Sequence, residues 1–189
     1  MNLNELTCKT AGIDDLDVVY NMLKLNFPPH ELHPRPKIAA AIQSKYFIAD
    51  LLLYKSKPVL LTCRWDLPYC EFWEYLAVHP DFHNQGIGSK FMRDYFQRRS
   101  SEKPCLLEVE LPQSELALRR INFYKRLGFI VQKYEYWQPE INPGHGAVPF
   151  KLMAYGRSLP YAEYETCVLE MMQMAYGRAD FDPLTGRKN

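Results

Sequence analysis

Three consecutive apolar segments constrain the fold of this chain more than any other feature of its sequence. Residues 46–54 and 58–66 are rich in β-forming side chains, and Lys55 to Lys57 between them have the length of a hairpin turn. Residues 70–78 are apolar on both faces except at two glutamates, which is the pattern of a central strand. The middle of the chain therefore predicts a sheet built from neighbouring strands.

The flanking sequence alternates between helical and extended patterns. Further strands are predicted at residues 5–10, 106–111, 129–137 and 150–155, and helices at residues 16–25, 37–44, about 87–100, 114–127 and 161–176. The proline-rich residues 26–36 are expected to be irregular, and the tail from Asp180 is expected to be loose. This order predicts an α+β fold with a mixed, mostly antiparallel central sheet of about six to seven strands and helices on both faces.

The composition favours a globular protein and gives no sign of nucleic-acid or membrane binding. The chain has 189 residues, 47% of them hydrophobic, and a formal net charge of +1, so we expect one globular domain over residues 1–189 and no nucleic-acid partner. No apolar run has the length of a membrane span or signal peptide, so no membrane partner is expected. The five cysteines include no C-x-x-C pair, which favours a reducing, cytoplasmic location and disfavours disulfides.

The most informative stretch for function runs from Val78 to Ser89. A buried strand leads into a turn with two glycines, Gly86 and Gly88, and then into a helix. The first amides of a helix have no partner within it and lie at its positive end, so such a turn suits a phosphate group. The nucleotide P-loop is excluded because Gly88 is not followed by Lys in register, and the Rossmann fingerprint because position 91 is Phe.

These residues resemble motif A of the Gcn5-related N-acetyltransferases, the GNAT family. That motif is a strand ending in V-x-P followed by Arg/Gln-x-x-Gly-x-Gly/Ala, and the chain reads His83-Asn84-Gln85-Gly86-Ile87-Gly88. His83 departs from the pattern at the Arg/Gln position. Because the main donors of such a loop are backbone amides, we expect His83 to retune the pyrophosphate contact rather than abolish it.

A second stretch, residues 119–129, resembles motif B of the same family, whose usual form is R-A-I-x-F-Y-E-K-L-G-F. The chain reads RRINFYKRLGF there, one predicted strand after motif A. By resemblance, Tyr124 donates a proton to the leaving coenzyme thiolate and Asn122 lines the coenzyme channel. A tyrosine that serves only packing is the alternative for Tyr124, and Phe123 and Leu127 are expected to be core.

The resemblance covers about residues 6–156 and leaves residues 157–189 as a helical extension. It implies the acyl-CoA N-acyltransferase fold, acetyl-CoA as co-substrate and no metal. The residues that it implies for coenzyme binding are Leu76, Ala77, Val78, His83, Asn84, Gln85, Gly86, Ile87, Gly88, Ser89 and Asn122. In the family the strand at 70–78 separates from the next one, and an amide at Val78 would polarise the thioester carbonyl.

Transfer to an amine requires a base, because an alkylammonium has a pKa of about 10. Glu74 is the first candidate; strand alternation places it with Leu76 and Val78, and opposite Trp73 and Tyr75 unless a bulge intervenes. Glu108 is the second candidate. It shares a face with Glu110, and either residue could act as a base or as an anchor for a cationic substrate. A glutamate that is simply paired with a cation is the alternative in each case.

Other polar residues carry weaker signals. His30 and His33 flank Glu31 and Leu32 without a further patterned ligand, so a metal site is not expected, and by resemblance their loop lies over the acceptor pocket. No serine or cysteine lies in a nucleophile elbow, which leaves a hydrolase unsupported. The methionines at 171, 172 and 174 fit helix packing or a dimer face, and both a monomer and a homodimer stay open.

The function predicted from these patterns is transfer of the acetyl group of acetyl-CoA to a primary amine, on a small molecule or a peptide, by direct attack in a ternary complex. Three alternatives remain. The donor could be a longer acyl-CoA, the protein could be a non-catalytic acyl-CoA sensor, or it could be an interaction domain that binds no coenzyme.

Overall fold

The computed structural model describes residues 5–188, which group into two compact units. The N-terminal unit contains the chain up to Asp66 together with Trp73–Ser100, and the C-terminal unit contains Leu67–Phe72 together with the chain from Ser101. The expectation of a single domain over residues 1–189 stays a prediction.

The N-terminal unit is built on four strands in the order β1 (Leu6–Thr10), β2 (Phe47–Tyr54), β3 (Lys57–Asp66) and β4 (Glu71–Val78), whose first two residues belong to the C-terminal unit. β1 pairs antiparallel with β2, and β2 pairs antiparallel with β3. Lys55 and Ser56 form the turn between β2 and β3 with φ values of 47° and 65°. Positive φ at both turn residues matches the twist of a two-residue hairpin, so the predicted hairpin is confirmed.

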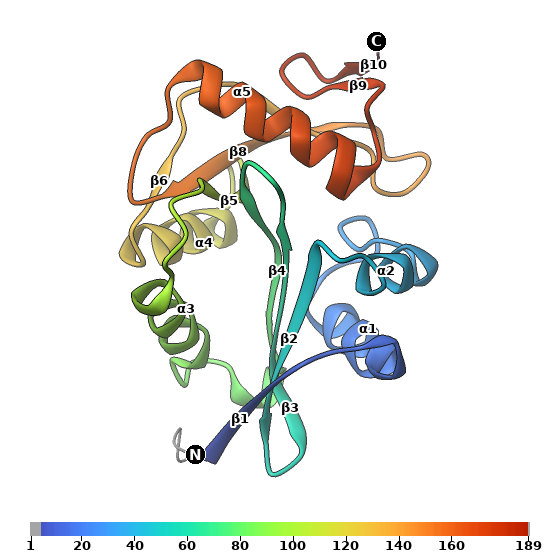
Figure 1. Cartoon of the computed structure of the whole chain (residues 1–189), viewed down its shortest axis with the longest axis vertical. Coiled ribbons are helices and arrows are strands. Elements are labelled where there is room, and N and C mark those ends of the chain that lie inside the picture. Colours follow the sequence, from blue (N-terminus) through green and yellow to red (C-terminus); the bar gives the residue numbers. More distant parts are fainter. Residues whose placement is uncertain (1–4, 189) are drawn as a thin grey trace. The chain divides into compact units, whose positions relative to one another are not determined.

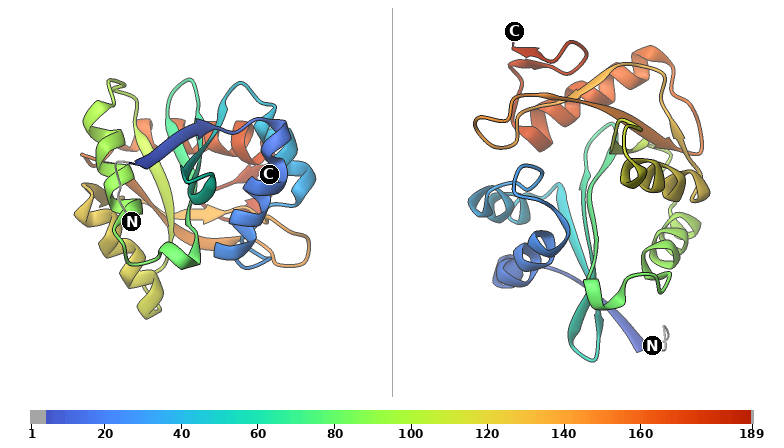
Figure 2. Two further views of the ribbon diagram at one scale, coloured as in Figure 1. Left: turned by 90° about the horizontal axis from the view of Figure 1, so that it is seen from below. Right: turned by 180° about the vertical axis from the view of Figure 1, so that it is seen from behind.

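Helices cover both faces of this sheet (Figure 1). α1 (Leu16–Asn26) and α2 (Arg35–Ile42) lie on one face, and α3 (Ile87–Arg98) lies on the other, as the views in Figure 2 also show. α1 buries Leu16, Val19, Met22 and Leu23 along one face, as an amphipathic helix on a sheet does. α2 begins two residues earlier than predicted, because prolines before and just inside a helix start suit its first turn.

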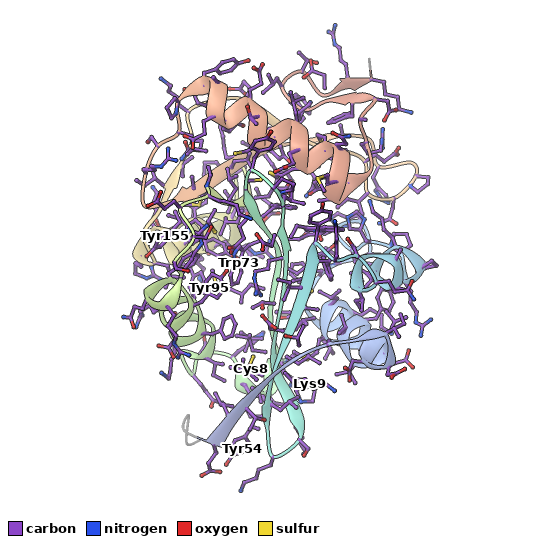
Figure 3. The ribbon with its side chains drawn as sticks, in the orientation of Figure 1. Cys8, Lys9, Tyr54, Trp73, Tyr95 and Tyr155 are labelled. Atoms are coloured by element: carbon purple, nitrogen blue, oxygen red, sulfur yellow. The ribbon has the colours of Figure 1, made fainter. Side chains whose placement is uncertain are left out.

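An aromatic stack joins β4 to α3. The Trp73 ring lies 4.9 Å from that of Tyr95 and 5.9 Å from that of Phe96, and Figure 3 shows Trp73 and Tyr95 on facing elements. The Arg64 guanidinium lies 5.1 Å from the centre of the Tyr95 ring, and Arg64 also pairs with Asp50. The charge of Arg64 is therefore compensated inside the unit by a carboxylate and by aromatic faces.

The C-terminal unit is organised around β8 (Val148–Tyr155). β5 (Cys105–Glu110), β6 (Phe129–Val131) and β7 (Tyr136–Gln138) each pair antiparallel with it. α4 (Glu115–Arg126) and α5 (Tyr161–Glu170) lie on opposite sides of these strands (Figures 1 and 2). α5 continues as a π-helix over Met171–Tyr176, and a short hairpin of β9 (Phe181–Asp182) and β10 (Arg187–Lys188) follows.

Two expectations about this unit were wrong. The strand predicted at 129–137 is divided into β6 and β7, because Gln132 is buried and its side chain bonds to the backbone of Leu159 and Ile130 instead of alternating outward. The tail beyond Asp180 is not loose. Phe181 is buried, and the carbonyl of Pro183 accepts the Trp137 amide, so the tail is attached to β7.

The α+β fold class with a mostly antiparallel sheet and helices on both faces is confirmed. None of the described helices combines the length and the apolar character needed to cross a bilayer. All five cysteines are free; Cys8 on β1 is exposed (Figure 3), and the other four are buried.

Candidate active site

The glycine turn in the N-terminal unit has the backbone conformation that the sequence suggests. β4 ends at Val78, a short 3-10 turn covers Pro80–Phe82, and Asn84 and Gly86 then take positive φ values of 60° and 73°. Gly86 is the residue that precedes α3. A Cβ built at Gly86 would meet no atom within 4 Å, so the backbone there is open to a ligand.

The amides of this turn are not used inside the fold. Within the described part of the chain, the N–H groups of Gln85 through Ser89 donate to no protein acceptor, and no side chain caps the start of α3. Gln85 and Gly86 are exposed. The turn therefore presents consecutive free donors at the positive end of a twelve-residue helix, an arrangement that suits an anion.

His83 bonds back to the strand that precedes it. Its Nε2 lies 2.8 Å from the carbonyl oxygen of Val78, so Nε2 donates in this contact. The Gln85 side chain donates to the carbonyl of Asp81 at 3.3 Å. Both side chains therefore brace the turn from within, and a direct contact between His83 and a pyrophosphate stays a prediction.

The alternation of side chains along β4 is interrupted at Glu74. Trp73 packs against α3, and Leu76 and Val78 belong to a cluster that contains Ile87 of α3. Glu74 and Tyr75, although adjacent, both contact the segment between α1 and α2. These contacts break strict alternation between Trp73 and Tyr75, so the placement of Glu74 with Leu76 and Val78, and of Trp73 with Tyr75, was wrong.

The Glu74 side chain is buried between the imidazole of His33 and the indole of Trp65. Its Oε1 lies 3.0 Å from Nε2 of His33, and its Oε2 accepts from Nε1 of Trp65 at 2.8 Å. The side chains of His33 and Glu74 are 2% and 6% exposed. Glu74 thus contacts an imidazole with one oxygen and an indole N–H with the other, and its role as a base stays a prediction.

The loop between α1 and α2 is attached to β4 beside this pair. The Tyr75 hydroxyl donates to the carbonyl of Glu31 and accepts from the amide of His33, each at 3.3 Å, and its ring packs against Phe27. His30, by contrast, is exposed and lies 3.6 Å from Glu31. The two histidines therefore do not converge, and the described residues contain no group of three or more potential metal ligands.

Tyr124 lies on α4 in the C-terminal unit, between two aromatic rings. Its ring centre is 5.1 Å from that of Phe123 and 5.7 Å from that of Phe129. No hydrogen-bond partner for its hydroxyl exists among residues 5–188. Burial raises the pKa of Tyr124 to about 12, against a smaller lowering by Arg120, so the hydroxyl keeps its proton at neutral pH.

The other residues of interest on α4 are exposed, form an ion pair or end the helix. Asn122 is exposed on the same helix. Arg120 donates to Glu110 at 2.9 Å, so both are used in an ion pair between α4 and β5. Leu127 ends the helix as a buried residue, and Gly128 follows with φ of 97°, as predicted for a helix C-terminus.

Glu108 is surrounded by donors that the sequence did not suggest. The Tyr136 hydroxyl donates to Oε1, and Gln138 Nε2 donates to Oε2 at 2.6 Å. The Tyr176 hydroxyl lies 2.8 Å and 2.7 Å from the two oxygens. The only sequence signal for this cluster was general: a buried carboxylate and buried tyrosines all need polar partners.

This chain is similar to known acetyltransferases in sequence and in structure. Residues 45–131 match the family model of the acetyltransferase (GNAT) domain. A search of curated protein sequences finds no match. A GNAT-family protein from Bacteroides thetaiotaomicron is 26% identical, covers 90% of this chain and 98% of its own, and superposes with a TM-score of 0.79.

More distant structures share the fold. The ribosomal-protein-S18-alanine N-acetyltransferase from Escherichia coli is 19% identical with a TM-score of 0.57, over 82% of this chain and 96% of its own. A chimera of the spermidine N-acetyltransferase SpeG from Vibrio cholerae and hSSAT is 13% identical with a TM-score of 0.60, over 80% of this chain and 95% of its own. At these identities the likeness concerns the fold alone.

Proposed function

This chain belongs to the GNAT family of acetyltransferases, and from that premise we propose that it moves the acetyl group of acetyl-CoA directly to a primary amine bound beside it. One observation carries the proposal: the free amides of Gln85 through Ser89 at the start of α3. Consecutive amides at a helix N-terminus bind the diphosphate of a coenzyme without needing a particular side chain.

The rest of the coenzyme site follows from β4 and the turn. In this proposal the backbone of Leu76, Ala77 and Val78 bonds the pantetheine arm, and the residues from His83 to Ser89 bind the diphosphate. The Val78 amide steadies the oxyanion of the tetrahedral intermediate, as preorganised backbone donors do. The contact between His83 and the Val78 carbonyl supports this by fixing the end of the strand. Asn122 lines the channel from α4.

For the chemical step, Glu74 is the proposed base, directly or through a water molecule. The bond from the Trp65 indole to its Oε2 at 2.8 Å supports this role, because it fixes the orientation of the carboxylate. Tyr124 is the proposed acid, which protonates the coenzyme sulfur as the tetrahedral intermediate collapses. Its protonated, protein-unbonded hydroxyl is suited to that task.

The test is release of free coenzyme A thiol from acetyl-CoA in the presence of a panel of primary amines, run beside calorimetric titration with acetyl-CoA. Binding with steady, amine-dependent thiol release is the expected result. Binding without release from any amine would identify a coenzyme sensor, and faster release from a longer acyl-CoA would reassign the donor. Absence of binding would overturn the proposal.

The same proposal treats residues 1–189 as one acetyltransferase domain acting in the cytoplasm on a small-molecule or peptide amine. A monomer and a homodimer are both compatible with it. Sedimentation of the purified chain decides between the two, and equilibrium unfolding with two spectroscopic probes tests whether it behaves as one cooperative domain.

A further inference from the structure

His83 stands at the position where the family pattern has arginine or glutamine. Arginine is always charged in proteins, and glutamine is always neutral. A histidine side chain changes its charge between about pH 5 and 8, so it can resemble either residue. His83 lies only two residues before Gln85, the first of the free amides at the start of α3, so its charge bears directly on this turn.

The hydrogen bond that His83 makes is compatible with both charge states of its ring. Nε2 donates to the Val78 carbonyl at 2.8 Å. A neutral imidazole with its proton on Nε2 makes this bond, and so does an imidazolium, in which both ring nitrogens carry protons. His83 is exposed, and its side chain has no other hydrogen bond within residues 5–188. Nδ1 can therefore take up a proton from solvent without breaking the bond that braces the turn.

The second histidine next to the turn, His79, responds to a proton differently. Its Nδ1 accepts the amide of Asp81 at 3.3 Å, which requires that this nitrogen carries no proton. A proton on Nδ1 would break that bond and would draw the ring toward Asp81 Oδ2, which lies 3.7 Å away. Protonation of His79 therefore rearranges the short 3-10 turn, whereas protonation of His83 only adds charge.

A charge on His83 is close enough to act on an anion at the turn. The Cα atoms of His83 and Gln85 are two peptide units apart, which is at most about 7.6 Å. This separation is shorter than the Debye length of about 10 Å at 0.1 M salt. Besides His79, the neighbouring elements carry Asp81 on the 3-10 turn and Lys90 on α3, and Lys90 pairs with Asp94 at 2.8 Å. Carboxylates and alkylamines ordinarily titrate outside the range from about pH 5.5 to 7.5.

We propose that His83 makes coenzyme binding depend on pH, because the turn binds the diphosphate more tightly when the His83 ring is protonated. The proposal rests on the proposed function, since it takes the coenzyme diphosphate as the ligand of the turn. In alkaline solution the position then acts like the glutamine of the family pattern, and in acidic solution like the arginine. Binding takes up a fraction of a proton at intermediate pH, because the bound anion favours the charged ring.

The probe is dephospho-coenzyme A, titrated calorimetrically into the full chain from about pH 5.5 to 7.5 at low salt. This ligand keeps the diphosphate and lacks the 3′-phosphate, a monoester that itself titrates near about pH 6. Two buffers of different ionisation enthalpy are used, so that the heat also counts the protons taken up. The variants are His83→Gln and His83→Arg. His79→Asn is the matched control, because an asparagine oxygen can accept the Asp81 amide as His79 does.

One added charge at this separation from a dianion corresponds to about threefold to tenfold tighter binding in water. We therefore expect the parental Kd to be about threefold to tenfold lower at the acidic end of the range, with proton uptake between the two ends. His83→Gln and His83→Arg should bind with nearly constant affinity and take up no proton, and His83→Arg should bind more tightly. His79→Asn should keep the parental pH dependence, and high salt should reduce it in both.

Three results would overturn the inference: a parental affinity that does not change with pH, a pH dependence that survives in both His83 variants, or its loss in His79→Asn. Thermal unfolding at each pH shows whether every variant is folded. If a His83 variant does not fold, proton uptake by the parent and by His79→Asn decides. Failure of the proposed function has a different signature, because then neither acetyl-CoA nor dephospho-coenzyme A binds at any pH, and the inference fails with it.

Discussion

Replacing Tyr124 with phenylalanine tests the proposed catalytic hydroxyl while it leaves the packing of the ring in place. The substitution keeps the ring between Phe123 and Phe129 and removes one hydroxyl, which has no protein partner among the described residues. No hydrogen bond is lost from the fold, so the free energy of unfolding should change by about 0.5 kcal/mol or less.

The expected loss of turnover follows from the two pKa values involved. A general acid contributes about 10² to 10⁴ in rate. The leaving thiol has a pKa of about 8.5, so its anion already departs readily, and this places the benefit at the lower end of that range. The pKa of Tyr124, about 12, lies above that of the thiol, which limits the benefit further. We expect kcat to fall about tenfold to a hundredfold, or about 1.4 to 2.7 kcal/mol.

The assay is thiol release under saturating acetyl-CoA, with the KM for acetyl-CoA and the thermal midpoint measured on the same preparation. Tyr155→Phe is the control, because the Tyr155 ring packs on the same Phe129 at 5.5 Å without a proposed role in the reaction. A Tyr124→Phe enzyme that turns over at the parental rate refutes the acid assignment. A fall in kcat that Tyr155→Phe reproduces would attribute the effect to packing.

Three further changes test the surrounding structure. Gly86→Ala should cost about 1 to 2 kcal/mol of unfolding free energy because its φ is 73°, whereas Gly12→Ala, equally open but at φ −100°, should cost less in the same urea titration. Glu170→Gln removes a buried carboxylate from two backbone amides and should lower the unfolding free energy by about 1 to 3 kcal/mol; an equal loss in Glu165→Gln on the same helix would argue against this anchor. Because Tyr124 keeps its proton to about pH 12 when folded but only to about 10 when unfolded, its contribution is complete below pH 10 and is lost between pH 10 and 12. The parent should therefore lose more stability than Tyr124→Phe between pH 9 and 11, and parallel losses would contradict the burial of this hydroxyl.

Local patterns predicted most of the fold because they arise from the chain's own periodicity. The helices α1, α3 and α4 repeat apolar residues at helical spacing, and the strands β2 to β5 are short, largely apolar runs. The glycine turn before α3 was predictable for the same reason, since strand, glycines and helix follow one another directly.

Features that depend on distant partners were not predictable. The break in alternation at Glu74 is visible only once His33 and Tyr75 are placed, because strand alternation alone assigns Glu74 and Tyr75 to opposite faces. Gln132 divides a strand through a bond to Leu159, and Tyr176 reaches Glu108 across 68 residues. Nothing in the sequence near these positions indicates which long-range contact will form.

The contrast between Cys8 and the other cysteines has a practical consequence. A maleimide dye added to the native chain should label a single site on β1, because the four remaining thiols are buried. Unfolding exposes all five, so the stoichiometry of labelling reports directly on the fraction of molecules that have opened. The same difference gives colorimetric thiol detection a low protein background and provides a ready position for a fluorophore or spin label without mutagenesis.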